Sequence, residues 1–224
     1  MLRVLFTRLV APWVWAKPQR AASLLLSFSR AERSSMLDML AAARATPSDT
    51  RRAQYLTHAL DEERHARTFF ARARELRDGR VSTDENAADF DALYERLGET
   101  GFVAYVHRGE RRGRAQFEQH RSVLRARGDE QGARLFEAIL VDEARHEAYT
   151  HALLLELAGS EASARAALRK AALREALWTW RRAGRNVSGL LFTIATSLLF
   201  LLLAPLHLLY RNRKKPGWIT RGAR

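Results

Sequence analysis

The chain has 224 residues, which is enough for one domain with a hydrophobic core and additional segments. It contains no cysteine, which excludes disulfides, iron–sulfur clusters, zinc–thiolate sites and an internal cysteine-bound electron carrier. Lys and Arg number 38 against 25 Asp and Glu. This excess favours an anionic partner, either nucleic acid or a layer of lipid headgroups.

The tryptophans favour the lipid partner. All of them lie near the two ends of the chain, at Trp13, Trp15, Trp178, Trp180 and Trp218. Tryptophan prefers the membrane–water interface, where its ring is buried and its N–H stays hydrated. We therefore expect membrane lipids as partners and no nucleic acid.

The first segment, residues 1–16, is apolar with Arg3 and Arg8 interspersed. A signal peptide is one reading, because Ala16 could precede a cleavage site. Arg8, however, divides the apolar run and leaves no continuous hydrophobic region. We favour an interfacial segment over 1–19 that lies on the membrane.

Apolar residues at helical spacing predict four long helices. The predicted ranges are 20–45, 49–78, 100–127 and 130–158. The polar segment 79–98 joins the second helix to the third and contains a short candidate helix. A connection of this length favours a crossover between two helix pairs, as in some four-helix bundles.

Two of these helices carry nearly the same pentapeptide. Residues 61–65 read DEERH, and residues 142–146 read DEARH. Glu and His three residues apart share one helix face and can bind the same transition-metal ion. One such pair arises often by chance, whereas two copies with the same Asp and Arg are far more specific. The alternative is a pair of solvated, salt-bridged helix faces.

The other two helices offer one further carboxylate each. Glu32 lies on an apolar stripe, where burial without a partner is costly. It is as far from Pro47 as Glu62 is, so the two should face each other in an antiparallel hairpin. On the third helix, Glu110 lies on an apolar stripe, whereas Glu118 has arginine neighbours. We select Glu110.

These residues form a recognisable ligand set. The expected metal ligands are Glu32, Glu62, His65, Glu110, Glu143 and His146. One Glu from each of two helices and E-x-x-H from each of the other two can build a di-iron or di-manganese site. Four carboxylates balance two divalent ions. We expect two iron ions, with manganese or a mixed pair as alternatives. His58 is read as packing or as a supporting residue, and Glu147 as an additional carboxylate or a surface charge.

Through these residues, the region from about 20 to 158 resembles the ferritin-like di-iron carboxylate superfamily, in its oxygen-activating, demethoxyubiquinone hydroxylase-like or rubrerythrin-like branch. The resemblance implies an all-α ferritin-like four-helix bundle. It also implies that Glu62 and Glu143 bridge the two ions and are the catalytic carboxylates. Two departures are the missing rubredoxin domain of rubrerythrins and an added C-terminal span.

The resemblance also assigns the residues around the ligands. An Asp just before each bridging Glu would support the metal-bound His of the opposite helix, and Asp61 and Asp142 occupy those positions. Arg64 and Arg145 match the D-E-x-R-H form typical of monooxygenases and desaturases, and would join the same network.

The C-terminal part indicates a membrane anchor. Residues 159–185 predict a basic amphipathic helix on the membrane surface, with a fifth helix packed on the bundle as the alternative. Residues 186–210 contain no Lys, Arg, Asp or Glu and are long enough to cross a hydrocarbon core of about 30 Å. A basic tail follows at 211–224. We expect a single-pass protein, with its catalytic domain on the reducing, cytoplasmic face.

The expected function is a di-iron monooxygenase or oxidase that uses O₂ on a lipidic or quinone-like substrate. Without an internal electron carrier, a separate reductase or ferredoxin must supply electrons. The alternatives are a ferroxidase or other iron-handling membrane protein, and a non-catalytic helical adaptor. A homodimer is compatible with either function.

Overall fold

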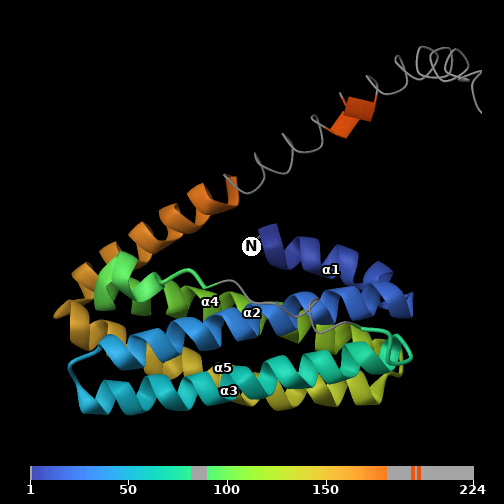
Figure 1. Ribbon diagram of the computed structural model, residues 1–224, viewed down its shortest axis with the longest axis horizontal. Helices are drawn as coiled ribbons and strands as arrows, with labels where there is room; N and C mark the ends of the chain where they lie inside the picture. Colours follow the sequence, from blue (N-terminus) through green and yellow to red (C-terminus); the bar gives the residue numbers. More distant parts are fainter. Residues whose placement is uncertain (1, 82–89, 181–192, 195, 198–224) are drawn as a thin grey trace, which may run out of the picture. The chain divides into compact units, whose positions relative to one another are not determined.

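The computed structural model describes residues 2–81, 90–180, 193–194 and 196–197 (Figure 1). The described residues contain helices and no strands, which confirms the all-α fold class. The chain divides into two compact units, Met1–Ala172 and Leu173–Arg224, and each is described by itself.

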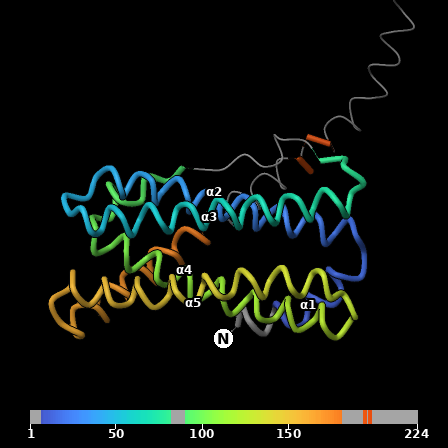
Figure 2. The backbone as a smooth tube through the Cα atoms, turned by 90° about the horizontal axis from the view of Figure 1, so that it is seen from below, coloured from blue at the N-terminus to red at the C-terminus, as the bar shows by residue number. Residues whose placement is uncertain are grey.

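The first unit is built from two helix hairpins. Its helices are α1 (Leu2–Trp15), α2 (Pro18–Ala45), α3 (Asp49–Leu76), α4 (Leu93–Ala126) and α5 (Glu130–Ala158). Helix α2 packs along α3, and α4 packs along α5 (Figure 2). The backbone N–H of Leu93 donates to Asp38 Oδ1 at 3.1 Å, which places the start of α4 beside the end of α2. Helices α3 and α4 therefore run in the same direction, as the predicted crossover requires.

The helix ends follow local sequence. Ser48 is the N-cap of α3, and its Oγ accepts from the backbone N–H of Arg51. Gly159 ends α5 at φ 69°, a conformation that glycine adopts without steric cost. Helix α4 begins earlier than the predicted 100, because the short helix expected in the crossover joins it across a non-helical residue, Gly98.

One aromatic layer fills the core between the hairpins. Phe28, Phe69, Phe117 and Phe136 come from α2, α3, α4 and α5 in turn, and every pair has ring centroids between 5.1 and 6.2 Å apart. Truncating one such ring to Ala typically costs about 3–5 kcal/mol of stability. Phe28 lies one turn from Glu32, so the layer closes one side of the predicted ligand set.

Helix α1 corrects part of the prediction for 1–19. Trp15 lies in the core rather than at a membrane interface, because its indole N–H donates to buried His120 Nδ1 at 3.1 Å. Ala11 is buried with it. Leu9 and Trp13 are 70% and 61% exposed, so this outer face of α1 is available to a lipid surface.

Residues 161–180 are helical. In the first unit, Ala164 and Ala171 are buried and Leu168 is partly buried, as expected of a fifth helix packed on the bundle. In the second unit, Leu173, Leu177 and Trp180 are exposed.

Within the part of the chain that the structure describes, no helix combines the length and apolar character needed to cross a bilayer. The span predicted at 186–210 lies outside the described residues, apart from positions 193, 194, 196 and 197, as does the tail at 211–224.

Candidate metal centre

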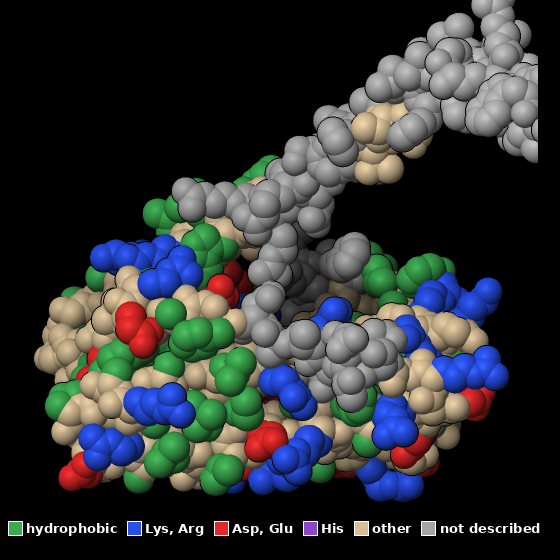
Figure 3. Space-filling model, in the orientation of Figure 1, with side chains coloured by type: hydrophobic (Ala, Val, Ile, Leu, Met, Phe, Trp, Pro, Cys, Tyr) green, Lys and Arg blue, Asp and Glu red, His purple; other side chains and the backbone are tan. Residues whose placement is uncertain are grey.

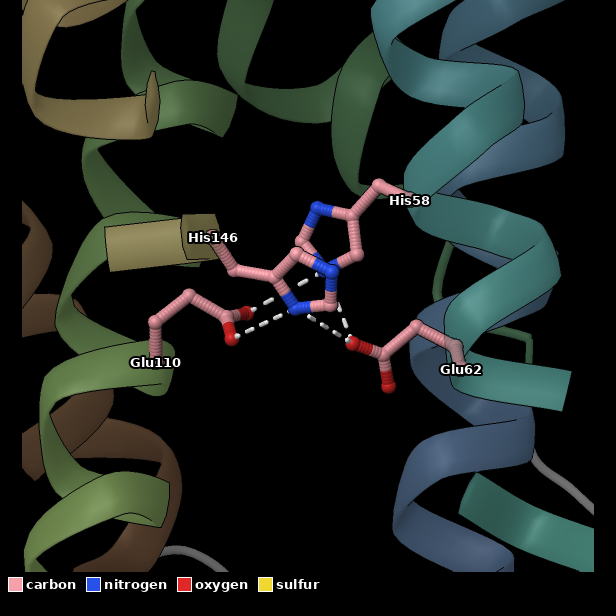
Figure 4. A group of neighbouring side chains, drawn as sticks. All are labelled: His58, Glu62, Glu110 and His146. Carbon is pink, nitrogen blue, oxygen red and sulfur yellow. Dashed lines mark hydrogen bonds and ion pairs between the residues drawn. The ribbon is translucent and has the colours of Figure 1, made fainter. Parts of the chain in front are cut away.

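The bundle core brings acidic and imidazole side chains together in two groups. We call the first position A, formed by Glu32, Glu62, His65 and Glu143. We call the second position B, formed by His58, Glu62, Glu110 and His146 (Figure 4). In each group, one candidate ligand atom per residue lies within 4.8 Å of all the others. Glu62 belongs to both positions, whereas Glu143 belongs only to position A.

All six sequence-predicted ligand residues lie in these two groups. Helix α3 supplies Glu62 and His65 from one face, and the hairpin turn brings Glu32 to the same height, as the equal distances from Pro47 predicted. Glu110 is 7% exposed and faces inward. The rejected candidate Glu118 lies on the outside of α4, where its side chain is 46% exposed and pairs with Arg114 at 3.8 Å.

Two of the histidines each contact an aspartate of the opposite helix through Nε2, the ring nitrogen that points away from the centre. His65 Nε2 on α3 lies 3.1 Å from Asp142 Oδ2 on α5, and His146 Nε2 on α5 lies 3.2 Å from Asp61 Oδ2 on α3. A carboxylate at this distance accepts the Nε2–H proton. It thereby leaves the Nδ1 lone pair directed at the centre.

Two arginines tie this network to the surface. Arg64 Nη2 donates to Asp61 and Asp142 at 2.6 and 2.7 Å. Arg145 Nη2 donates to the same two residues at 2.6 and 2.8 Å. Burial opposes ionisation of Asp142, but hydrogen bonds from His65 and Arg64 outweigh it and lower its pKa to about 2. The Asp residues therefore stay anionic and hold the imidazole protons on the outside.

The inward atoms show that the residues present fit a metal ion. His65 Nδ1, His146 Nδ1 and Glu62 Oε2 are buried without a hydrogen-bond partner in the described part of the molecule. His65 Nδ1 lies 3.5 Å from Glu143 Oε1, and His146 Nδ1 lies 3.6 Å from Glu62 Oε1. Two ligand atoms about 2.1 Å from one ion are about 3.0–3.4 Å apart, so these two His–Glu pairs are close to the spacing of ligands on a shared ion.

The clustering of buried carboxylates also favours bound cations. Burial raises the pKa of Glu32, Glu62 and Glu143 well above the usual range, and neighbouring carboxylates raise each of them further. Carboxylates at this spacing cannot all ionise in a dry core unless positive charge lies between them. Divalent ions in positions A and B would supply that charge.

Gly113 leaves space beside position A. A Cβ atom added there would lie 3.4 Å from Glu143 Oε2, so a larger side chain would press on this carboxylate. At Gly109, one turn earlier, an added Cβ meets nothing within 4 Å. Sequence analysis alone does not distinguish these two helical glycines.

A polar pocket opens on the outer side of α4 and α5. Its volume is about 430 Å³, and its lining comprises His107, Arg111, Arg114, Ala144, Glu147, Ala148, His151 and Leu168. Glu147 pairs with Arg114 at 2.8 Å and belongs to neither metal position, so it is not the additional ligand considered from sequence. On the face drawn in Figure 3, Lys and Arg side chains are scattered among hydrophobic ones rather than gathered in one basic patch.

His58 is the one member of positions A and B that was not predicted as a ligand from the sequence. It lies one turn before Glu62 on the same face of α3, which is the only sequence signal for it. Its counterpart one turn before Glu143 is Ile139, so the repeated pentapeptide gives no reason to expect a third histidine.

No family model matches the chain, and comparisons with curated proteins and with solved structures returned no match. The ferritin-like resemblance therefore remains a prediction that rests on the ligand motif.

Proposed function

We propose that this protein is a di-metal oxidoreductase of the ferritin-like type that uses O₂ to oxidise a lipidic or quinone-like substrate at a membrane. The observation that carries the proposal is the pair of adjoining positions A and B, which share Glu62 and direct unpartnered ligand atoms into one core. Buried polar atoms without a hydrogen-bond partner call for an explanation, and a bound ion is one that suits carboxylate and imidazole atoms facing one another.

Each part of the centre has a defined task in this proposal. Two redox-active ions, iron foremost, would supply electrons for O₂ reduction. Asp61 and Asp142 keep the imidazole protons on Nε2, so that both Nδ1 atoms stay available as ligands. The phenylalanine layer excludes bulk water on one side. The missing side chain at Gly113 leaves Glu143 free of contact from that position of α4.

Electrons must come from outside the chain, because it contains no cysteine for an iron–sulfur relay. The membrane part of the proposal is supported by exposed apolar side chains at both ends of the described chain. Leu9 and Trp13 lie on α1, and Leu173, Leu177 and Trp180 lie on the helix at 161–180. Their exposure is typical of helices that rest on a lipid surface.

Iron handling is the second candidate function, and the polar pocket favours it. Its lining of His107, Arg111, Arg114, Glu147 and His151 is too polar for an acyl chain, which favours a function without a lipidic substrate. In this case the same centre would oxidise Fe²⁺ without turning over an organic substrate.

Metal content is the first test. Purified protein loaded with Fe²⁺ under anaerobic conditions should hold about two ions per chain. The double variant Glu62→Ala/Glu143→Ala should lose most of this metal because both positions lose ligands. The control Glu118→Ala removes an exposed carboxylate from α4 and should keep two. Full retention in the double variant would contradict the proposal.

Oxygen uptake then separates the two functions. An oxidase supplied with a chemical reductant should consume more O₂ when its lipid or quinone substrate is added, and mass spectrometry of lipids from cells with and without the gene should identify that substrate. Uptake that stops once the added Fe²⁺ is oxidised, with no organic molecule stimulating it, would favour iron handling.

A further inference from the structure

His58 has the geometry of a metal ligand rather than of a core histidine. Its side chain is fully buried on α3, with Nε2 2.7 Å from Glu62 Oε1 and 3.6 Å from Glu110 Oε1. Its ring stacks on His146, with 3.7 Å between centroids (Figure 4). His58 therefore reaches from α3 toward ligand residues of both hairpins.

The other ring nitrogen of His58 has an outer partner. Nδ1 lies 2.5 Å from Tyr149 Oη on α5. When the proton sits on Nδ1, the phenol oxygen accepts it and the Nε2 lone pair points into position B. His65 and His146 also have outer partners, Asp142 and Asp61. Their inner Nδ1 atoms have no hydrogen-bond partner, whereas His58 Nε2 lies within hydrogen-bond distance of Glu62 Oε1, a contact that a bound ion would replace. Such an outer partner is what orients a metal-bound imidazole.

We propose that His58 is a seventh metal ligand and makes the two positions chemically unequal. This inference rests on the proposed di-metal centre. Position A offers three carboxylates and one imidazole, whereas position B offers two carboxylates and two imidazoles. The repeat in α3 and α5 would by itself give two equivalent positions. Two features break that equivalence. Glu143 belongs only to position A, and His58, whose place in α5 is taken by Ile139, belongs only to position B.

Unequal ligands imply unequal metal preference. Imidazole suits Fe²⁺, Co²⁺ and Zn²⁺, whereas an oxygen-rich shell suits Mn²⁺, which binds nitrogen ligands most weakly in this series. Position B should therefore load first when Co²⁺ or Fe²⁺ is limiting. Position A should accept Mn²⁺ once position B is filled. The expected product of loading with both metals is one ion of each kind per chain.

The test is a Co²⁺ titration of metal-free full-length protein, followed by its visible absorption and by elemental analysis. Wild type should bind two Co²⁺, with one tighter than the other. His58→Ala should weaken the tighter ion by about 10–100-fold or more and change its absorption bands, while the weaker ion stays as before. His120→Gln, which changes a buried histidine outside both positions and outside the polar pocket, should behave as wild type.

Tyr149→Phe provides a second variant in case His58→Ala folds poorly. It removes only the outer partner of His58, so the loss of affinity should be about tenfold and confined to the tighter ion. Loading wild type with equal Mn²⁺ and Co²⁺ should give one of each per chain, and His58→Ala should lose this selectivity.

The outcomes distinguish this inference from the proposed function. Two Co²⁺ bound by His58→Ala with wild-type affinities and spectrum would overturn the role of His58 and leave the di-metal centre standing. A wild-type protein that binds no Co²⁺, Fe²⁺ or Mn²⁺ would overturn both.

Discussion

His120 shows how burial sets the protonation state of a single side chain in this core. His120 is 2% exposed, accepts a hydrogen bond from the Trp15 indole, and stacks on Phe136. Burial lowers its pKa from 6.5 to about 4. The folded protein therefore keeps this imidazole neutral at pH values where an unfolded chain would protonate it.

The lowered pKa of His120 predicts that this residue contributes to the loss of folding stability in acid. Between pH 6.5 and pH 4 the unfolded state binds the proton and the folded state does not, so stability falls as the pH falls. The shift corresponds to at most about 3 kcal/mol. Denaturant unfolding at pH 7 and pH 4.5 should show His120→Gln losing less stability than wild type over this interval. Equal losses in the two proteins would contradict the prediction.

At the scale of one element, α4 contains two glycines of low helix propensity, one of which lies close to a candidate ligand. Gly109 and Gly113 both have helical geometry, but only Gly113 faces a candidate ligand. Glycine within a helix costs about 0.8–1.0 kcal/mol relative to Ala. At Gly113 a larger side chain would press on Glu143, so the lower helix propensity of glycine accompanies an undisturbed carboxylate.

The two glycines should respond differently to substitution. Gly109→Ala should raise the free energy of unfolding by up to about 1 kcal/mol without changing metal content, because its Cβ enters open space. Gly113→Leu should disturb Glu143 and weaken metal binding, while a fully helical circular dichroism spectrum shows that the bundle remains folded. Unchanged metal affinity in Gly113→Leu would show that Glu143 is not needed where the structure places it.

At the scale of the whole molecule, the centre connects the two hairpins. Position A joins Glu32, Glu62 and His65 of the α2–α3 hairpin to Glu143 of α5, and position B joins α3 to Glu110 and His146. Ions in these positions would bind only the assembled bundle, because their ligands come from both hairpins. Without positive charge there, burial and neighbouring carboxylates raise the pKa of Glu32, Glu62 and Glu143 and oppose their ionisation.

Metal removal should therefore lower the melting temperature. An ion present at 100 times its dissociation constant stabilises the folded state by about 2.7 kcal/mol. In a protein of this size, that is about 5–10 °C per position. Differential scanning calorimetry with and without Fe²⁺ or Mn²⁺ measures the shift. The Glu62→Ala/Glu143→Ala protein is the control, and its melting temperature should not respond to metal.

Much of this arrangement was predictable because helical periodicity is a local property. The spacing of apolar residues located the four long helices, and two E-x-x-H pairs identified which faces turn inward. The distances of Glu32 and Glu62 from Pro47 were enough to place them opposite each other. The choice of Glu110 over Glu118 followed from the arginines around Glu118.

Other features depend on contacts between distant segments. Trp15 was grouped with the lipid-facing tryptophans, but packing of α1 against α4 brings it to His120. The helix at 161–180 is divided, with Ala164 and Ala171 packed on the bundle and Leu173 and Leu177 exposed. Composition could not reveal this division, because both halves are amphipathic and basic.

The sequence by itself determined the all-α class, the hairpins and the six side chains directed at one core, because these follow from spacing along a helix. Only the tertiary structure decided that Glu62 is common to both positions, and that Tyr149 on α5 orients His58 on α3. The direction of a ring nitrogen is set by its neighbour across the bundle, and no periodicity within one helix carries that information.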